Sequence, residues 1–457
     1  MKYIENIINV IEEELNINRQ YIIKAIRKNK ANYKGDYTII CYMLKNQLVE
    51  SPIIIAEKIV EVLNNKGIEN IQLEQTYINI YLDNKVKIKS FLYKVNRNTN
   101  KYEDNKVNII YKLKKFNEMF TINDLYKCIV IEFIYKIHLI DNYNVHKNNF
   151  LGNEKNLNDT YIINKIREEQ LISKYCDKDI INLKYFNLPP LILENNTENK
   201  YEVTLKELSD LLYKINCNEI NKIIIINNRY EKLKTKQILA VLKSIDYDIE
   251  NKISNIYLGF IKLNENIKKY ENKPVDTIKL IYKRSKDEVI EALENNNVLI
   301  NKEEIEKIIL QNINFKFLSK NLGSDIIFDY EDSFNYKNNI YLQVKILEMR
   351  IYESIKTMKK KKRNEVYTHN DLIIEIELIH IIEEFEMLRE NQLVTYRIEK
   401  FISILEKIVV FSYKMYKEEC EIILFYEVIY NIIGIILRYI EISTDILIEN
   451  IQKLTEY

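Results

Sequence analysis

The sequence predicts an α/β multidomain protein with a small α+β N-terminal domain, a Rossmann-like parallel-sheet middle domain and an all-α C-terminal helical bundle. Three observations along the 457 residues predict this order. Residues 1–95 combine helical and strand-like hydrophobic patterns, residues 106–325 alternate strand-like and helix-like stretches, and residues 326–457 carry helical periodicity alone. We take these three ranges as the expected domains.

In the N-terminal domain, three stretches space their apolar residues as helices do. They are residues 1–20, 37–48 (YTIICYMLKNQL) and 52–65 (PIIIAEKIVEVLNN). The third follows Ser51 and opens with a proline, which is a typical helix cap and first-turn pair. Residues 68–84 alternate apolar and polar side chains with period two, which predicts strands.

Five stretches of the middle domain alternate between strand and helix. In chain order they are VNIIY (107–111), LYKCIVIEFIYKIHLI (125–140), NKIIIINN (221–228), QILAVLKSI (237–245) and NIYLGFIKL (255–263). The third is apolar enough to be a buried parallel strand. This alternation favours a doubly wound parallel sheet.

The C-terminal domain shows four long amphipathic patterns joined by short polar loops. They cover residues 341–358, 369–388, 395–416 and 423–442. Each places apolar residues at helical spacing, which predicts an antiparallel bundle.

Composition and charge argue against a strongly basic nucleic-acid-binding protein, a metal-binding protein, a secreted protein and a membrane protein. The formal net charge is +1, so RNA binding would have to come from local basic patches. The five cysteines form no CxxC pair, so we expect reduced thiols in a cytoplasm and no metal. The N-terminus is acidic and amphipathic, unlike a signal peptide. Charges break the longest apolar runs within about a dozen residues, so we expect no membrane span.

Residues 116–128 (FNEMFTINDLYKC) connect the first strand of the middle domain to its first helix. In nucleotide-binding α/β proteins, this junction binds phosphate and normally carries glycines. Here the stretch has no glycine and no histidine, and its single lysine, Lys127, lies inside the helical pattern. The sequence therefore has the junction but lacks the residues that hold a phosphate.

Short segments in the N-terminal and C-terminal domains match one known family in order and spacing. They are Lys34-Gly35-Asp36-Tyr37, Ser51-Pro52 with Ala56-Glu57-Lys58-Ile59, Tyr77-Ile78-Asn79-Ile80, Phe328-Asp329-Tyr330, Tyr341-Leu342-Gln343 and Ile432-Ile433-Gly434-Ile435. In these segments the chain resembles the arginyl-tRNA synthetases. The resemblance implies an N-terminal domain that docks on the tRNA elbow, a class I Rossmann-like catalytic domain and an anticodon-binding bundle of the DALR type.

The resemblance places the family's first ATP signature, His-Val-Gly-His, on Thr121, Ile122, Asn123 and Asp124. Tyr111 and Leu125 fix this alignment. Both histidines and the glycine are absent. The fourth position, Asp124, carries a carboxylate where the family holds ATP phosphates. The negative carboxylate would repel a negative phosphate there.

Two further family sites are altered. The second ATP signature falls on Lys268 and Lys269, which are followed by a glutamate and lack the family's serine. The segment for amino-acid recognition resembles residues 203–208, where Glu207 keeps a carboxylate but Val203 replaces a tyrosine. Loss of both ATP signatures on a retained scaffold is expected when a fold is kept and its chemistry is lost.

The strongest basic cluster comprises Lys356, Lys359, Lys360, Lys361, Lys362 and Arg363. It is either a solvated helix end, where cations complement the helix dipole, or a contact to RNA phosphates. Tyr341 and Gln343 are either core residues of the first bundle helix or RNA contacts. The resemblance implies an RNA surface in the N-terminal domain, with Tyr37 and Asn79 as candidates.

The histidines favour structural roles. We expect His138 and His146 to be core or surface residues, because neither has an obvious partner carboxylate or nucleophile. His369 precedes Asn-Asp at an expected helix start, and His380 lies in an apolar stripe that predicts a core position.

Three functions remain open from the sequence. The first is a catalytically degenerate arginyl-tRNA synthetase paralogue that needs no cofactor and binds tRNA or tRNA-like RNA. The second is an active arginine–tRNA ligase that uses ATP, with Lys268 or Lys269 acting on phosphates and Asn123 replacing the histidine donors. The third is a scaffold or regulatory subunit with a protein partner and no RNA role.

Overall fold

The structure is a computed structural model of the chain. It describes residues 2–29, 34–68, 70–96, 105–111, 121–140, 142–149, 166, 168–175, 178–192, 220–245, 252–263, 274–328, 335–361, 369–396, 398–420 and 422–441. The chain forms two compact units. The first consists of residues 1–98, 355–387 and 411–431, and the second of residues 99–354, 388–410 and 432–457.

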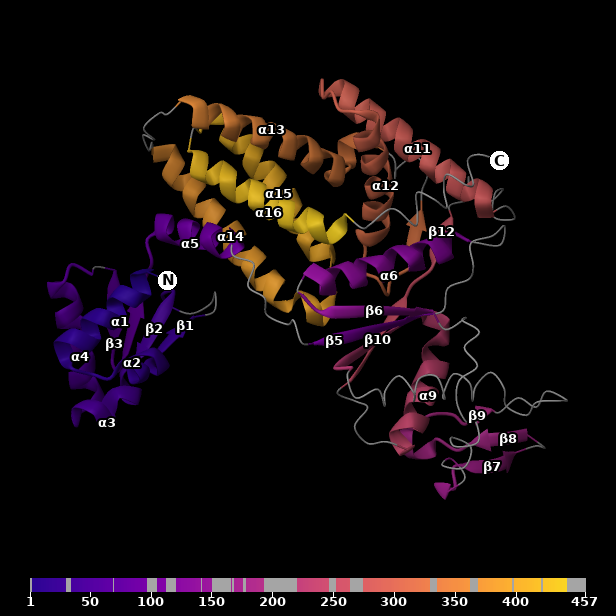
Figure 1. Ribbon diagram of the computed structural model, residues 1–457, viewed down its shortest axis with the longest axis horizontal. Coiled ribbons are helices and arrows are strands. Elements are labelled where there is room, and N and C mark those ends of the chain that lie inside the picture. Colours follow the sequence, from indigo (N-terminus) through magenta and orange to yellow (C-terminus); the bar gives the residue numbers. More distant parts are fainter. Residues whose placement is uncertain are drawn as a thin grey trace. The chain divides into compact units, whose positions relative to one another are not determined.

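The N-terminal part of the first unit is an antiparallel sheet covered by helices (Figure 1). The sheet has the order β1-β2-β4-β3, and a core of isoleucines such as Ile39, Ile59 and Ile78 fills the space under it. The elements are α1 (Lys2–Leu15), α2 (Arg19–Ala25), β1 (Ile26–Lys28), β2 (Tyr37–Ile40), η1 (Cys41–Leu44), α3 (Lys45–Leu48), α4 (Pro52–Asn65), β3 (Ile71–Glu74), β4 (Tyr77–Ile80) and α5 (Asn84–Asn96). The predicted α+β class is confirmed for this part of the chain.

Local boundaries in this part were predicted with mixed success. Ser51 caps α4 as expected, since its Oγ accepts a hydrogen bond from the Ile54 N–H at 3.3 Å. The single helix predicted over residues 37–48 was wrong. Tyr37–Ile40 instead forms strand β2, because these residues pair with β1 on one side and β4 on the other. Sheet pairing overrides the helical spacing of their side chains.

The second unit contains the predicted parallel sheet. Its order is β11-β10-β5-β6, and every pair of neighbouring strands is parallel. The strands are β5 (Lys106–Tyr111), β6 (Asn144–Asn149), β10 (Lys222–Asn228) and β11 (Ile253–Leu258), with α6 (Ile122–Ile140), η3 (Arg229–Glu231) and α9 (Lys232–Ile245) in the connections. Figure 1 shows α6 and α9 on opposite faces of this sheet. The doubly wound architecture is confirmed.

The stretch predicted as one strand over residues 255–263 is two strands. β11 ends at Leu258, and β12 (Ile261–Leu263) pairs instead with β13 (Ile326–Phe328). Between them lies Gly259, where a Cβ would stand 2.1 Å from the Ser324 carbonyl oxygen. Only glycine permits this close approach of two backbones.

The remaining elements of the second unit form a small sheet and a pair of helices. The antiparallel sheet contains β7 (Ile172–Tyr175), β8 (Lys178–Ile181) and β9 (Leu191–Ile192), with η2 (Lys184–Phe186) beside it. Two long helices, α11 (Pro274–Asn295) and α12 (Lys302–Leu318), pack against each other and precede η5 (Tyr336–Asn338). These two helices were not predicted from the sequence.

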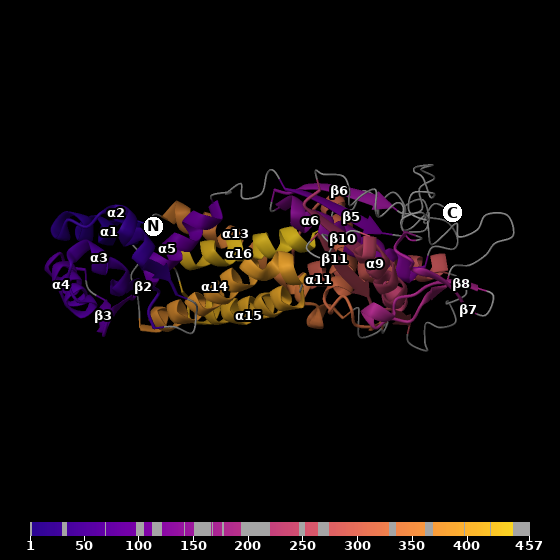
Figure 2. The ribbon, with the colours of Figure 1, turned by 90° about the horizontal axis from the view of Figure 1, so that it is seen from below.

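The four predicted bundle helices are confirmed as α13 (Ile340–Lys361), α14 (His369–Thr395), α15 (Ile398–Lys417) and α16 (Ile423–Ile440). They lie side by side in both views (Figures 1 and 2). α16 is apolar and long enough to cross a membrane by length and composition alone, but 61% of it is buried inside the protein. It therefore serves as a core helix.

Candidate functional site

The candidate site lies at the carboxyl edge of the parallel sheet in the second unit. From the central pair of strands, β5 connects through α6 to β6 on one side, and β10 connects through α9 to β11 on the other. Ligands of open α/β sheets bind at such a switch point. The described residues nearest to it are the ends of β5 and β10, the first turn of α6, and Asn228 to Glu231.

Thr121 and Asp124 close the N-terminus of α6 with reciprocal hydrogen bonds. The Asp124 carboxylate accepts from the Thr121 N–H at 2.9 Å and from the Thr121 hydroxyl at 2.7 Å. In return, the Asp124 N–H donates to Thr121 Oγ1 at 3.2 Å. This is a capping box with aspartate in the place of glutamate. The carboxylate occupies the helix end that an anionic ligand would otherwise use.

The two residues between them, Ile122 and Asn123, also make contacts within the protein. Ile122 is 6% exposed and belongs to the core. The Asn123 side-chain oxygen accepts a hydrogen bond of 2.8 Å from the Ile261 N–H in β12. The four residues that the resemblance places on the first ATP signature therefore cap α6, fill the core and anchor a neighbouring strand.

Asp325 holds the turn between β11 and β12 from the other side. Its Oδ1 accepts from the Phe260 N–H at 3.0 Å, and its Oδ2 lies 2.7 Å from Lys262 Nζ. The hydrogen bond from Lys262, followed by that from the Phe260 backbone, lowers the pKa of Asp325. Asp325 is therefore a charged anchor for the segment that leads toward Lys268 and Lys269, which lie outside the described residues.

A second capping box follows β10. The Glu231 carboxylate accepts from the Asn228 N–H at 3.0 Å. Tyr230, which directly precedes Glu231, is 67% exposed. The Tyr230 ring stacks on Phe260 at 5.8 Å with an interplanar angle of 14°. This turn was not predicted from the sequence, although its Asn-x-x-Glu spacing is a signal for a capping box.

The predicted RNA-contact residues fall in different environments. Tyr37 is half-buried on β2, and Asn79 is 5% exposed on β4, where its side-chain oxygen accepts from the Thr38 hydroxyl at 2.8 Å. Tyr341 is fully buried, so its ring is part of the core and not of the surface. Gln343 donates to the Lys337 carbonyl oxygen at 2.6 Å.

The basic cluster begins on the last turn of α13. Lys359 and Lys360 are exposed, and Lys359 Nζ lies 2.8 Å from Glu427 Oε1. Lys361 is the last residue of α13. Lys362 and Arg363 lie outside the described residues, as does Glu207. The structure therefore brings part of this cluster to the surface of the first unit.

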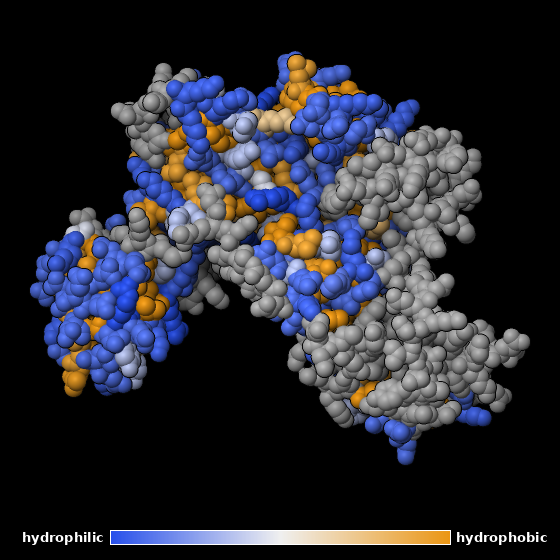
Figure 3. Space-filling model, in the orientation of Figure 1, coloured by the Kyte–Doolittle hydropathy of each residue, from blue (hydrophilic) through white to orange (hydrophobic). Residues whose placement is uncertain are grey.

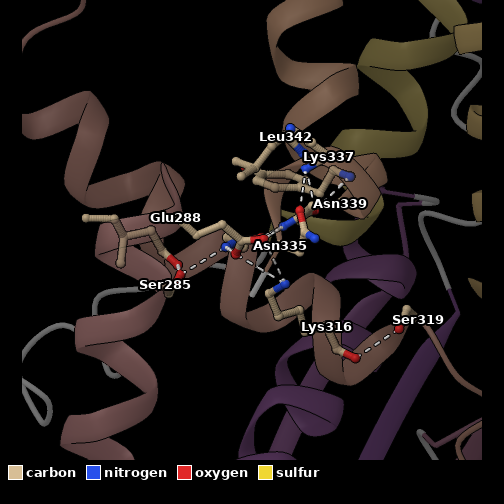
Figure 4. Close-up of polar contacts among 11 residues, drawn as sticks. Ser285, Glu288, Lys316, Ser319, Asn335, Lys337, Asn339 and Leu342 are labelled. Carbon is tan, nitrogen blue, oxygen red and sulfur yellow. Dashed lines mark hydrogen bonds and ion pairs between the residues drawn. The ribbon is translucent and has the colours of Figure 1, made fainter. Parts of the chain in front are cut away.

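A buried polar network explains why Tyr341 lies in the core (Figure 4). The Asn339 amide donates to Glu288 at 2.9 Å and to Asn312 at 2.7 Å, while its oxygen accepts the Tyr341 N–H at 3.1 Å. Lys316 Nζ pairs with Glu288 at 3.2 Å, and burial, which outweighs that carboxylate, lowers the pKa of Lys316. The network thus joins α11 and α12 to the start of α13, whose first residues must face inward.

The histidines lie apart from the switch point or are engaged elsewhere. His138 is 1% exposed, and its Nε2 lies 3.0 Å from the Tyr396 hydroxyl. Burial, together with the charge of Lys222, lowers the pKa of His138 to about 4. His146 is exposed on β6, and His369 begins α14 as expected. The core position predicted for His380 was wrong, because 73% of its side chain is exposed.

Within the described residues, no group of three or more His, Cys, Asp or Glu side chains could hold a metal ion. The free thiols of Cys41 and Cys420 are buried, and that of Cys128 is half-buried. Burial raises the pKa of both Cys41 and Cys128 to about 12. These two thiols are therefore poor nucleophiles at neutral pH.

Comparisons with known proteins agree with the architecture described above. The family described as "Arginyl tRNA synthetase N terminal domain" matches residues 2–82. Arginine–tRNA ligase of Clostridium botulinum strain Langeland is 21% identical over 450 residues, which cover 75% of this chain and 80% of the relative. Over these ranges the chain is similar in sequence to the arginyl-tRNA synthetases.

Solved structures of the arginyl-tRNA synthetase family share its fold. The Thermus thermophilus enzyme superposes with a TM-score of 0.61 at 10% identity, over 97% of this chain and 99% of that one. The Plasmodium falciparum enzyme gives a TM-score of 0.55 at 13% identity, over 97% and 98%. Another relative, arginine–tRNA ligase of Clostridium kluyveri, is 24% identical over 254 residues, or 53% of this chain and 43% of the relative.

Proposed function

We propose that this chain is a catalytically degenerate member of the arginyl-tRNA synthetase family that binds tRNA or tRNA-like RNA in the cytoplasm. The observation that carries the first half is the capping box of Thr121 and Asp124. Groups aligned with the family's ATP signature are engaged with one another and carry a carboxylate at the helix N-terminus. No cofactor is needed for this function.

The chemistry explains why these contacts matter. Activation of an amino acid transfers an adenylyl group, and catalysis of such a step depends on positioned donors around phosphate oxygens. An imidazole can donate to phosphate, whereas an ionised carboxylate accepts hydrogen bonds and repels anions. In this chain, Asp124 already uses the Thr121 N–H that a phosphate could have used.

The assay for catalysis is ATP–pyrophosphate exchange with arginine and tRNA present. We expect no exchange above background, with the Clostridium botulinum arginine–tRNA ligase as the positive control under the same conditions. Robust exchange by this chain would overturn the degenerate assignment. It would favour an active ligase in which Asn123 and Lys268 or Lys269 serve ATP.

The hydrogen bonding of Asn123 gives less support to an active ligase than to the degenerate protein. Its oxygen is held by the Ile261 N–H, so only the side-chain NH₂ remains to replace two imidazole donors. Glu207 would be its arginine-recognition residue. The further alternative, a scaffold or regulatory subunit, would be favoured by a pulldown that gives a protein partner without RNA.

RNA binding is assigned to the N-terminal domain and the end of α13. Lys359 and Lys360 are exposed, and Lys361, Lys362 and Arg363 follow them in a sequence whose net charge is only +1. Tyr37 remains a candidate contact on β2. Gln343 is a weaker candidate. Asn79 would act indirectly, because its side-chain oxygen accepts a hydrogen bond from the Thr38 hydroxyl.

Filter binding with total tRNA tests this half of the proposal. We expect binding that weakens steeply as salt rises, because lysine contacts to phosphate release counterions. Absence of binding at low salt would contradict it, whatever the result of the exchange assay.

A further inference from the structure

Helix α5 of the N-terminal domain packs along α14 within the first unit (Figure 1). At its start, Asn84 hydrogen-bonds Glu375. In its middle, the Phe91 ring meets Phe385 edge-on at 6.1 Å, and both rings are buried. Near its end, Lys94 Nζ lies 2.9 Å from Glu386 Oε1. The contact therefore runs along most of α5.

Glu386 of α14 contacts two elements of the N-terminal domain. Besides Lys94, it pairs with Lys28 of β1 at 3.5 Å. Partial burial of Glu386 favours a raised pKa, but the hydrogen bonds and charges of Lys94 and Lys28 outweigh it and lower the pKa below its ordinary value. Glu386 is thus a charged acceptor shared by the sheet and α5.

A second link connects α14 to the segment that precedes Tyr37. Lys87 of α5 lies 3.8 Å from Glu383 and 2.8 Å from Asp36. The other Asp36 oxygen accepts from the Leu82 N–H at 2.7 Å. Gly35, with φ at 75°, brings its backbone against Ile80 at the same point. The turn that presents Tyr37 is therefore tied to α14 through Lys87.

We propose that Glu386 is a positioning residue for RNA binding, which clamps the N-terminal domain on α14 so that the two RNA-contacting surfaces act together. This inference rests on the proposed function. When the N-terminal domain is held in place, its surface is already near the second part of an RNA that the other surface has bound, so the effective concentration is high. A loosely attached domain would lose conformational entropy on binding, which weakens the affinity. The partner is then a folded RNA that contacts both surfaces, and not an isolated hairpin.

The experiment compares Glu386→Lys with Glu406→Lys, which makes the same charge change at an exposed position of α15. In Glu386→Lys, the new lysine would lie beside Lys28 and Lys94, and the three positive charges would repel one another. We therefore expect α5 to exchange its amide hydrogens faster than in the wild type, without any RNA present. Glu406→Lys is expected to leave the exchange of α5 unchanged. Unchanged exchange in Glu386→Lys would overturn the clamp.

RNA affinity provides the second measurement. We expect Glu386→Lys to weaken binding of whole tRNA by on the order of tenfold while sparing an anticodon-arm hairpin. Added positive charge by itself would strengthen RNA binding, so a loss cannot come from net charge. The double variant Lys94→Glu with Glu386→Lys re-forms that pair in reverse and is expected to recover affinity.

The outcomes separate the clamp from the proposed function. Faster exchange of α5 with unchanged tRNA affinity would overturn the positioning role and leave a structural contact. Equal losses for whole tRNA and the hairpin would also overturn it. If the wild-type chain binds no tRNA, the proposed function fails and the positioning role fails with it, while the exchange measurement still reports the clamp.

Discussion

Thr121 and Asp124 bond to each other at the first turn of α6, each donating its backbone N–H to the other's side chain. A helix end satisfied in this way needs no ligand for its stability. The residues that the resemblance places on a nucleotide signature thereby contribute to folding.

The first prediction concerns this cap. Thr121→Ala removes the hydroxyl and is expected to lower the free energy of unfolding by about 1 kcal/mol in urea titrations. Thr121→Ser keeps the oxygen and serves as the control, with little change expected. If alanine is tolerated as well as serine, the cap does not stabilise α6.

The second prediction concerns Gly259. A methyl group there would stand 2.1 Å from the Ser324 carbonyl oxygen, so Gly259→Ala is expected to cost about 2–3 kcal/mol in unfolding free energy. The matched control is Gly434→Ala in α16, where a Cβ meets nothing within 4 Å. That change is expected to stabilise the protein by about 0.5–1 kcal/mol, because alanine is the better helix former. Equal effects at both positions would contradict the close backbone approach.

The third prediction is a pH dependence that originates at His138. Its pKa is lowered to about 4 from 6.5, so the unfolded chain binds more protons between these two values. Stability is therefore full above pH 6.5 and falls as the pH drops toward 4, by on the order of 3 kcal/mol from this group. His138→Gln is expected to flatten that part of the profile relative to His146→Gln, which changes an exposed histidine. Parallel profiles for the two variants would refute the assignment.

The fourth prediction concerns the basic cluster. Lys359→Ala with Lys360→Ala is expected to weaken tRNA binding and to reduce the slope of log affinity against log salt by about 1–2. The comparison is Lys302→Ala with Lys307→Ala, which removes two exposed lysines from α12. Loss of the Lys359–Glu427 pair should have little effect on stability, because exposed ion pairs contribute about 0–1 kcal/mol. Identical binding by both double variants would place the RNA surface elsewhere.

The parallel sheet could be predicted because buried parallel strands are continuous apolar runs, as at Ile223–Ile226. Strand β2 could not, since Tyr37–Ile40 takes its conformation from partners distant in sequence. His380 was misplaced because α14 is apolar on more than one side. Leu372, Ile373 and Ile376 are also exposed there, so its apolar stripe does not mark one buried face.

At the candidate site, the Thr-x-x-Asp spacing at residues 121–124 was visible in the sequence and could have indicated a cap. The bond between Asn123 and Ile261 could not be anticipated, because the two residues are 138 positions apart. The same holds for Phe260 and Asp325, 65 positions apart. Local hydrogen bonds follow from spacing, whereas these depend on how the finished fold brings strands together.

Under the proposed loss of catalysis, the capping box also bears on whether the ATP signature could be regained. A histidine at position 121 alone would remove the hydroxyl of the cap, and a histidine at position 124 alone would remove its carboxylate. Each single step would lower stability while leaving the other half of the signature missing. Under that proposal, selection for a stable fold opposes reversal one substitution at a time, because the cap at these positions stabilises α6.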